Sequence, residues 1–224
     1  MGGILRRVVL KAYGATRVLR NLSLALLLGA GVGVAQPVTI AALGDSLTAG
    51  YGLFPGKGFV PQLHDWLAAH GVEVKVQNAG VSGDTTQGGL SRVDWTLTPD
   101  VEAMLVALGG NDLLRGIDPA LSRANLDGIL KKAKAAEIPV LLVGLRAPSN
   151  YGMDFKRAFD AMYPDLAAQY GTVYADSFFL GLRDVPGGPT DYMQADGIHP
   201  NAKGVALIVE GLGPKVLELI DRVK

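Results

Sequence analysis

The chain has 224 residues, which is enough for one domain with a sizeable core and short for two. Hydrophobic residues make up 49% of it and charged residues 19%, which excludes a disordered chain, and no aromatic and basic patch favours nucleic acid. Five basic residues and no acidic residue precede Asp45, so the remaining 16 basic side chains face 21 acidic ones, a net charge of −5. This mildly acidic balance also argues against a nucleic-acid partner. No cysteine is present, which excludes disulfides, thiolate metal sites and a cysteine nucleophile.

Residues 1–35 have the pattern of a secretory signal peptide. A basic stretch is followed by an apolar run over residues 22–35, which ends in the small residues Gly33-Val34-Ala35. The run is shorter than the roughly 20 residues that span a bilayer, which weighs against an uncleaved membrane anchor. The sequence therefore predicts cleavage after Ala35, no stable membrane insertion after that cleavage, and a bacterial periplasmic or secreted domain over residues 36–224.

Beyond residue 36, short apolar runs alternate with helical patterns, which predicts a parallel β-sheet with helices on both faces. We expect strands at Val38–Leu43, Val72–Val76, Ala103–Leu108, Val140–Val143 and Thr172–Ala175. The second run alternates with period two, as an edge strand does. We expect helices at Phe59–His70, Pro119–Ala136, Asp154–Tyr170 and Asn201–Val223. Glycine-rich loops, among them 80–89 and 109–116, follow the strands, and the rim they form is where α/β sheets place their sites.

Ser46 stands at the end of the first predicted strand, in Gly44-Asp45-Ser46-Leu47. A serine at the carboxyl end of a parallel strand is a candidate nucleophile if a base and an anion site can reach it. Most triplets of this kind are ordinary turns, so Ser46 alone carries no functional conclusion.

Asp196 and His199 stand three residues apart near the C-terminus, in Asp196-Gly-Ile-His199-Pro200. They would present a carboxylate and an imidazole on one turn, so that the aspartate fixes the histidine tautomer and the histidine acts as base toward a serine. The alternative is a simple helix start at Pro200 or Asn201. The other two histidines, His64 and His70, fall on or beside a solvent-facing helix.

Two glycine-rich segments after strands could supply hydrogen-bond donors. Gly109-Gly110-Asn111-Asp112 offers the Asn111 side-chain amide, and Asn78-Ala-Gly80-Val-Ser-Gly83 offers the Gly80 N–H. Together with the Ser46 N–H these would form a three-donor oxyanion hole, in which the loss of one donor typically costs about 10²–10³ in rate. Glycine turns capped by Asn or Asp are the plainer interpretation of either segment.

The combination of these segments resembles the SGNH hydrolases, also called the GDSL family. The family's first block matches Gly44–Leu47, its second-block glycine matches Gly80, its third block matches residues 109–112, and its last block matches Asp196 and His199. Loop residues 79–86, 109–116, 146–152 and 193–200 also resemble the bacterial arylesterase branch, which includes acyl-CoA thioesterase I and lysophospholipase L. The resemblance covers about residues 38–224.

The resemblance implies an α/β fold, a three-layer α/β/α sandwich with a flavodoxin-like, five-stranded parallel sheet. It also implies a serine esterase that acts on aryl and short-to-medium acyl esters, and on acyl thioesters or lysophospholipids, through a Ser46, His199 and Asp196 triad. Ser46, Gly80 and Asn111 would form the oxyanion hole, and no metal or organic cofactor is implied. Asp45 and Asp112, beside these positions, are expected to hold the loops.

Loops 112–117 and 146–152 are the expected substrate contacts, because related enzymes carry a mobile loop that matches the first of them. The predicted contact residues are Leu113, Leu114, Arg115, Ile117, Pro148, Asn150 and Tyr151. The apolar side chains would suit an acyl chain, and Arg115 or Arg146 could meet an anionic head group. Packing under a loop and solvated surface arginines are the plainer interpretations.

Three other functions remain compatible with parts of the pattern. A carbohydrate O-deacetylase would use the same scaffold and triad with a different pocket. Acyl transfer to an alcohol acceptor would use the same acyl-enzyme. A flavodoxin-like binding protein without catalysis would keep the fold, although five intact candidate residues count against it.

Overall fold

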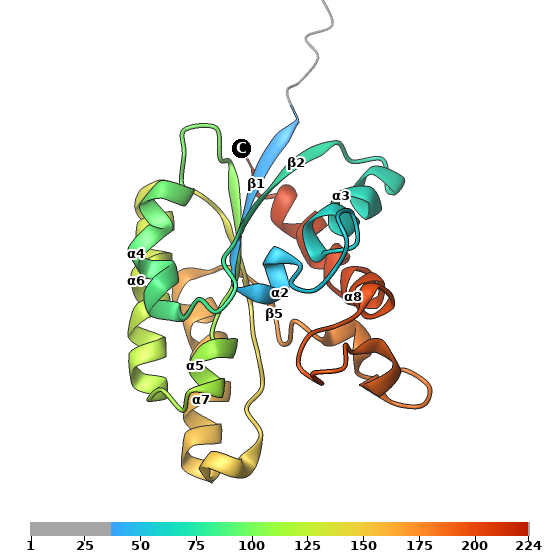
Figure 1. Ribbon diagram of the computed structural model, residues 1–224. Helices are drawn as coiled ribbons and strands as arrows, with labels where there is room; N and C mark the ends of the chain where they lie inside the picture. Colours follow the sequence, from blue (N-terminus) through green and yellow to red (C-terminus); the bar gives the residue numbers. More distant parts are fainter. Residues whose placement is uncertain (1–36, 224) are drawn as a thin grey trace, which may run out of the picture. The chain divides into compact units, whose positions relative to one another are not determined.

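Five parallel strands form the centre of the structure, a computed structural model that describes residues 37–223 (Figure 1). They are β1 (Val38–Gly44), β2 (Val74–Gly80), β3 (Ala103–Ala107), β4 (Val140–Val143) and β5 (Val173–Ala175). Their order in the sheet is β2-β1-β3-β4-β5 and every pairing is parallel. This is the flavodoxin-like order of doubly wound sheets, as predicted. The predicted signal peptide and its cleavage site lie outside the described residues.

Helices cover both faces of the sheet, which confirms the predicted three layers (Figure 1). One face packs against α3 (Phe59–Ala69) and α8 (Ala202–Ile220), and the other against α4 (Thr86–Thr96), α6 (Pro119–Ala135) and α7 (Met153–Tyr170). Strand side chains divide accordingly, because alternate residues point to opposite faces: Leu105 belongs to the first core and Val106 to the second. β3 is buried along its whole length, which explains its continuous apolar sequence.

The second strand lies at the sheet edge, as its alternation predicts, but it begins and ends later than expected. Val72 is part of the turn that closes α3, because its N–H donates to the Leu67 carbonyl at 3.0 Å. The strand then runs to Gly80, which pairs with Gly44 at the end of β1. The carboxyl ends of β1, β2 and β3 therefore meet at Gly44, Gly80 and Ala107.

Two helices stand where the sequence suggested only loops. α4 begins at Thr86 inside the glycine-rich segment 80–89, and the short α5 (Gly110–Leu114) follows β3 directly. Across residues 37–223, none of the helices has the length and hydrophobicity needed to cross a membrane.

Candidate active site

Ser46 lies at a sharp turn between β1 and the short helix α2 (Ser46–Ala49). Asp45 caps this helix, because its Oδ1 accepts a hydrogen bond from the Leu47 N–H at 3.0 Å. A glycine is required at position 44, since a Cβ there would lie 2.0 Å from Thr48 Oγ1. The sequence Gly-Asp-Ser thus ends the strand, caps the helix and places Ser46 at its first residue.

The structure brings Ser46, His199 and Asp196 into one hydrogen-bonded chain. His199 Nε2 lies 2.8 Å from Ser46 Oγ, and His199 Nδ1 lies 2.7 Å from Asp196 Oδ2. The two segments are 153 residues apart in the sequence. The loop that carries His199 is held by Gln194, whose N–H donates to the His199 carbonyl at 2.7 Å and whose Nε2 donates to the Tyr51 carbonyl at 2.9 Å.

Asp196 is held in its ionised form by hydrogen bonds. Its Oδ1 accepts the backbone N–H groups of His199 and Ile198, and its Oδ2 faces His199 Nδ1. These bonds lower the pKa of Asp196 to about 2, and the bond from the His199 N–H lowers it most. An ionised Asp196 accepts the Nδ1 proton of a neutral imidazole, which leaves Nε2 as the acceptor toward Ser46 Oγ.

A cavity of about 470 Å³ opens beside Ser46 and His199. Apolar side chains form much of its wall: Leu47, Leu113, Leu114, Leu145, Phe179 and Ile198. A second cavity of about 820 Å³ adjoins it, because Arg146, Ser177, Phe179 and Ile198 line both. Such a concave apolar site with a few convergent polar groups is typical of a small-molecule site.

Gly80, predicted as an oxyanion-hole donor, is not brought to this cavity. Its N–H donates to Asn78 Oδ1 at 3.0 Å, and its Cα packs so closely on α2 that a Cβ would lie 2.3 Å from the Ala49 nitrogen. Gly83, three residues later, lines the cavity instead and has a φ of +83°. Within residues 37–223 the Gly83 N–H has no hydrogen-bond acceptor. Of the two glycines in this segment, Gly83 and not Gly80 is therefore the one at the cavity.

Asn111, the predicted side-chain donor, lines the same cavity. Its Nδ2 donates to the Asp84 carbonyl at 2.9 Å and has a longer contact of 3.4 Å with Asp45 Oδ2. The first bond fixes the orientation of the amide, and the second hydrogen of Nδ2 is only weakly engaged.

The predicted substrate contacts are only partly brought to the cavity. Leu113 and Leu114 line it. Arg115 instead donates to the Gly83 carbonyl at 2.8 Å and Tyr151 to the Leu114 carbonyl at 3.3 Å, while Ile117, Pro148 and Asn150 lie outside the lining. Among the lining residues that sequence reasoning missed are Tyr51, Leu145, Ser177, Phe179 and Ile198. Leu145 follows the end of β4 by two residues, so the carboxyl-end rule could have identified it.

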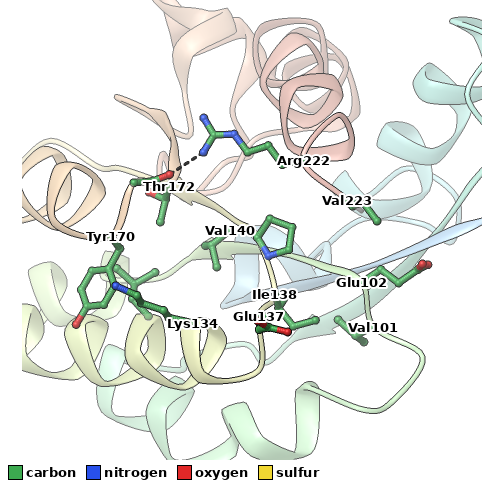
Figure 2. A pocket seen from close by; sticks show the side chains of 13 residues that line it. Val101, Glu102, Lys134, Glu137, Ile138, Val140, Tyr170, Thr172, Arg222 and Val223 are labelled. Atoms are coloured by element: carbon green, nitrogen blue, oxygen red, sulfur yellow. Dashed lines mark hydrogen bonds between the residues drawn. The ribbon is translucent and has the colours of Figure 1, made fainter.

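Another cavity of about 470 Å³ lies at the opposite end of the sheet (Figure 2). Residues just before or at the start of β3, β4 and β5 line it, among them Glu102, Val140 and Thr172. Its lining contains no serine or histidine, the residue types of the pair at Ser46 and His199. Within the described chain, no three His, Cys, Asp or Glu side chains are grouped to hold a metal ion.

Comparison with known proteins identifies the family. Residues 42–207 match the GDSL-like Lipase/Acylhydrolase family. Esterase TesA of Pseudomonas aeruginosa is 39% identical over 183 residues, 81% of this chain and 89% of the relative. Thioesterase 1/protease 1/lysophospholipase L1 of Escherichia coli K12 is 37% identical over 185 residues, which cover 82% and 85% of the two chains.

Solved structures agree with this assignment. The SGNH-hydrolase family esterase AlinE4 is 44% identical with a TM-score of 0.68, over 82% of this chain and 96% of that one. The psychrotrophic esterase EstA from Pseudoalteromonas sp., in a structure inhibited by monoethylphosphonate, is 31% identical with a TM-score of 0.74, over 82% and 98%. With its fold, its matched residues and these relatives, the chain belongs to the GDSL-like lipase/acylhydrolase family of SGNH serine esterases.

Proposed function

We propose that this esterase hydrolyses acyl esters through an acyl-enzyme formed on Ser46. The observation that carries the proposal is the hydrogen-bonded chain from Ser46 Oγ through His199 to Asp196, with distances of 2.8 and 2.7 Å, at the wall of an apolar cavity. A serine hydroxyl is a weak nucleophile until an adjacent base takes its proton, and the base needs a third group to orient it.

In the proposed reaction Ser46 Oγ attacks the acyl carbonyl while its proton passes to His199 Nε2. The ionised Asp196 stabilises the imidazolium that forms. His199 then gives the proton to the leaving alcohol or thiol, and water releases the acyl group by the same steps in reverse. Esters and thioesters use this sequence equally, because neither leaving group needs another catalyst.

The oxyanion of the tetrahedral intermediate would be held by three donors, with Gly83 in place of Gly80. The Ser46 N–H belongs to the first residue of a helix and is not used inside that helix. Gly83 lines the cavity, and no group among residues 37–223 accepts its N–H. The weakly engaged hydrogen of Asn111 Nδ2 completes the set. Donors of this kind act where charge develops in the transition state.

The acyl chain would occupy the apolar cavity formed by Leu113, Leu114, Leu145 and Phe179. The adjoining cavity would receive the leaving group. It is lined by Arg146 and Arg183, which share Asp176 as a partner at 2.8 and 2.7 Å and leave one positive charge in excess. The names of the relatives, an esterase, a thioesterase and a lysophospholipase, agree with aryl or short-to-medium acyl esters, acyl thioesters and lysophospholipids as substrates.

A p-nitrophenyl ester series from acetate to palmitate tests the proposal. We expect hydrolysis by the purified protein to fall by about 10³-fold or more in Ser46→Ala, because the nucleophile is lost. Ser91→Ala, an exposed serine whose hydroxyl donates to the Gly88 carbonyl, is the matched control and should keep full activity. The dependence of the hydrolysis rate on acyl length shows how long an acyl chain the cavity accepts.

Activity that survives in Ser46→Ala would refute the proposal. Folded protein with no activity on any ester in the series would favour an O-deacetylase, to be assayed on acetylated glycans, and bound yellow cofactor would favour a binding protein.

We further propose that residues 1–35 direct export and that the catalytic domain acts outside the cytoplasm. The basic stretch, the apolar run and the small residues before Gln36 support this. N-terminal sequencing of the exported protein should begin at Gln36, and a mature chain that retains its first 35 residues would contradict it.

A further inference from the structure

Arg92, on α4, binds three backbone or side-chain oxygens at the carboxyl end of the sheet. Its Nε donates to Asp84 Oδ2 at 2.7 Å, one terminal nitrogen donates to the Ala79 carbonyl at 2.7 Å, and the other donates to the Gly44 carbonyl at 2.8 Å. The side chains of Arg92 and Asp84 are only 22% and 12% exposed. All three nitrogens of the guanidinium are therefore engaged away from bulk solvent.

These three acceptors belong to the two segments that carry the proposed Ser46 and Gly83 donors. Gly44 stands two residues before Ser46, and its carbonyl also accepts the Val81 N–H at 3.0 Å. Ala79 lies where β2 leads into the loop that presents Gly83. Asp84 follows Gly83 directly, and its carbonyl accepts the Asn111 Nδ2 hydrogen at 2.9 Å. One guanidinium thus binds the segments that carry the Ser46 and Gly83 donors, and it holds the side chain of Asp84, whose carbonyl accepts from the third donor, Asn111.

We infer that Arg92 is a positioning residue, which fixes the spacing of the Ser46, Gly83 and Asn111 donors around the oxyanion. The inference rests on the proposed function. It requires the planar, five-donor guanidinium, because a lysine ammonium cannot reach three acceptors that lie in fixed directions around one plane. Small errors in such donors are costly, since a site displaced by about 1 Å can lose on the order of 10²-fold in rate.

Stability alone accounts less well for this arrangement. The ends of β1 and β2 are already paired through Gly44 and Gly80, and α4 is anchored in the core by Val93. A structural ion pair between Arg92 and Asp84 would also need only one of the three nitrogens. The other two nitrogens donate to the Ala79 and Gly44 carbonyls, which precede the turns that carry Gly83 and Ser46.

The test compares Arg92→Met and Arg92→Lys with Arg222→Met. Arg222 is the matched control, because it also donates to a backbone carbonyl, that of Gly171 at 2.7 Å, but at the far end of the sheet (Figure 2). We expect kcat for p-nitrophenyl butyrate to fall by about 10- to 100-fold in both Arg92 variants, with KM changed less than threefold, and both constants to stay within twofold in Arg222→Met. Arg92→Lys should recover thermal stability relative to Arg92→Met without recovering kcat.

Inhibition by a boronic acid distinguishes misplaced oxyanion donors from a general loss of structure. An alkylboronic acid forms a bond from Ser46 Oγ to boron while the serine proton passes to His199 Nε2, which gives a tetrahedral, anionic boronate that needs the same donors as the transition state. We expect the inhibition constant of butylboronic acid to rise in the Arg92 variants in parallel with the loss of kcat/KM. Asp84→Asn, which keeps an acceptor oxygen but weakens the bond to Arg92, should give a smaller loss in the same direction.

Folded Arg92 variants that match Arg222→Met in kcat and in boronate affinity would overturn the inference. So would a loss of activity that Arg92→Lys restores in full, because that would indicate a role for charge alone. Absence of Ser46-dependent hydrolysis in the unsubstituted protein would instead refute the proposed function, and the inference with it.

Discussion

At the scale of single residues, Asp45 is the most unusual group beside the nucleophile. The residue is 2% exposed, and within the described chain it has no cationic side chain as a hydrogen-bond partner. Burial raises the pKa of Asp45 to about 6, against the Leu47 hydrogen bond and the attraction of His199, which lower it. When Asp45 is ionised, its buried negative charge therefore lowers the stability of the folded protein.

This predicts that Asp45 lowers stability as pH rises, the opposite of a carboxylate whose pKa is lowered in the folded protein. Because its pKa is higher in the folded protein than the ordinary 3.8, the folded state binds the proton more tightly, so the free energy of unfolding falls as pH rises from about 4 to 6. Asp45→Asn should be more stable than the unsubstituted protein at pH 7, by about 1–3 kcal/mol, and the difference should vanish near pH 4. Urea unfolding at four pH values measures this.

The exposed Asp154 provides the control for that series. Asp154→Asn should shift stability little, and by the same amount at each pH, because its side chain is 93% exposed. An Asp45→Asn variant that is destabilised equally at every pH would show that the carboxylate contributes through its hydrogen bonds and not through the cost of its burial.

At the scale of elements, one buried carboxylate joins three helices around the candidate site. Asp112 on α5 accepts the Thr86 N–H at 2.9 Å, the Thr86 hydroxyl at 2.5 Å and the Ser122 hydroxyl at 2.8 Å. Thr86 begins α4 and Ser122 lies on α6. These hydrogen bonds fix the segment that carries Asn111 to its neighbours. The sequence suggests that Asp112 holds the loops, but it does not reveal the partners of Asp112.

The helices that the sequence did not predict depend on such contacts. α4 contains Gly88 and Gly89, which are poor helix formers and suggest a loop. In the structure both glycines allow close packing: a Cβ would lie 1.6 Å from Asp84 Oδ1 at Gly88 and 2.2 Å from a Leu108 methyl at Gly89. Steric need, which only the folded chain defines, overrides local propensity here.

The sequence pointed to Gly80 as the glycine at the cavity, where the structure has Gly83, for a similar reason. Gly80 and Gly83 both follow β2, and the alternating pattern ends at Val76, so nothing in the sequence tells which glycine is still in the strand. Ser46, Asp196 and His199 are easier to select from the sequence. The chain has only three histidines, and the three residues lie in the segments Gly44–Leu47 and Asp196–Pro200. Their catalytic roles remain predictions for the ester assay.

At the scale of the whole molecule, all five strands run in the same direction, so the sheet has one carboxyl end and one amino end. The five strands, the edge position of β2 and the helices on both faces followed from hydrophobic patterns alone, because buried parallel strands have continuous apolar sequences. The carboxyl end holds Ser46 and its cavity, and the amino end holds the cavity of Figure 2. Changes at the amino end should alter stability without altering the reaction.

Thr172 at the amino end provides the last prediction. Its Oγ1 is buried and has no hydrogen-bond partner among residues 37–223, which typically costs about 1–3 kcal/mol. Thr172→Val removes that hydroxyl and should raise the free energy of unfolding by about 1 kcal/mol or more, with kcat/KM within twofold. Thr86→Val is the opposite control, because its hydroxyl donates to Asp112 and its loss should lower stability by about 1.5–3 kcal/mol. A destabilised Thr172→Val would mean that a bound water completes the site, whereas a change in kcat/KM would mean that the two ends of the sheet are coupled.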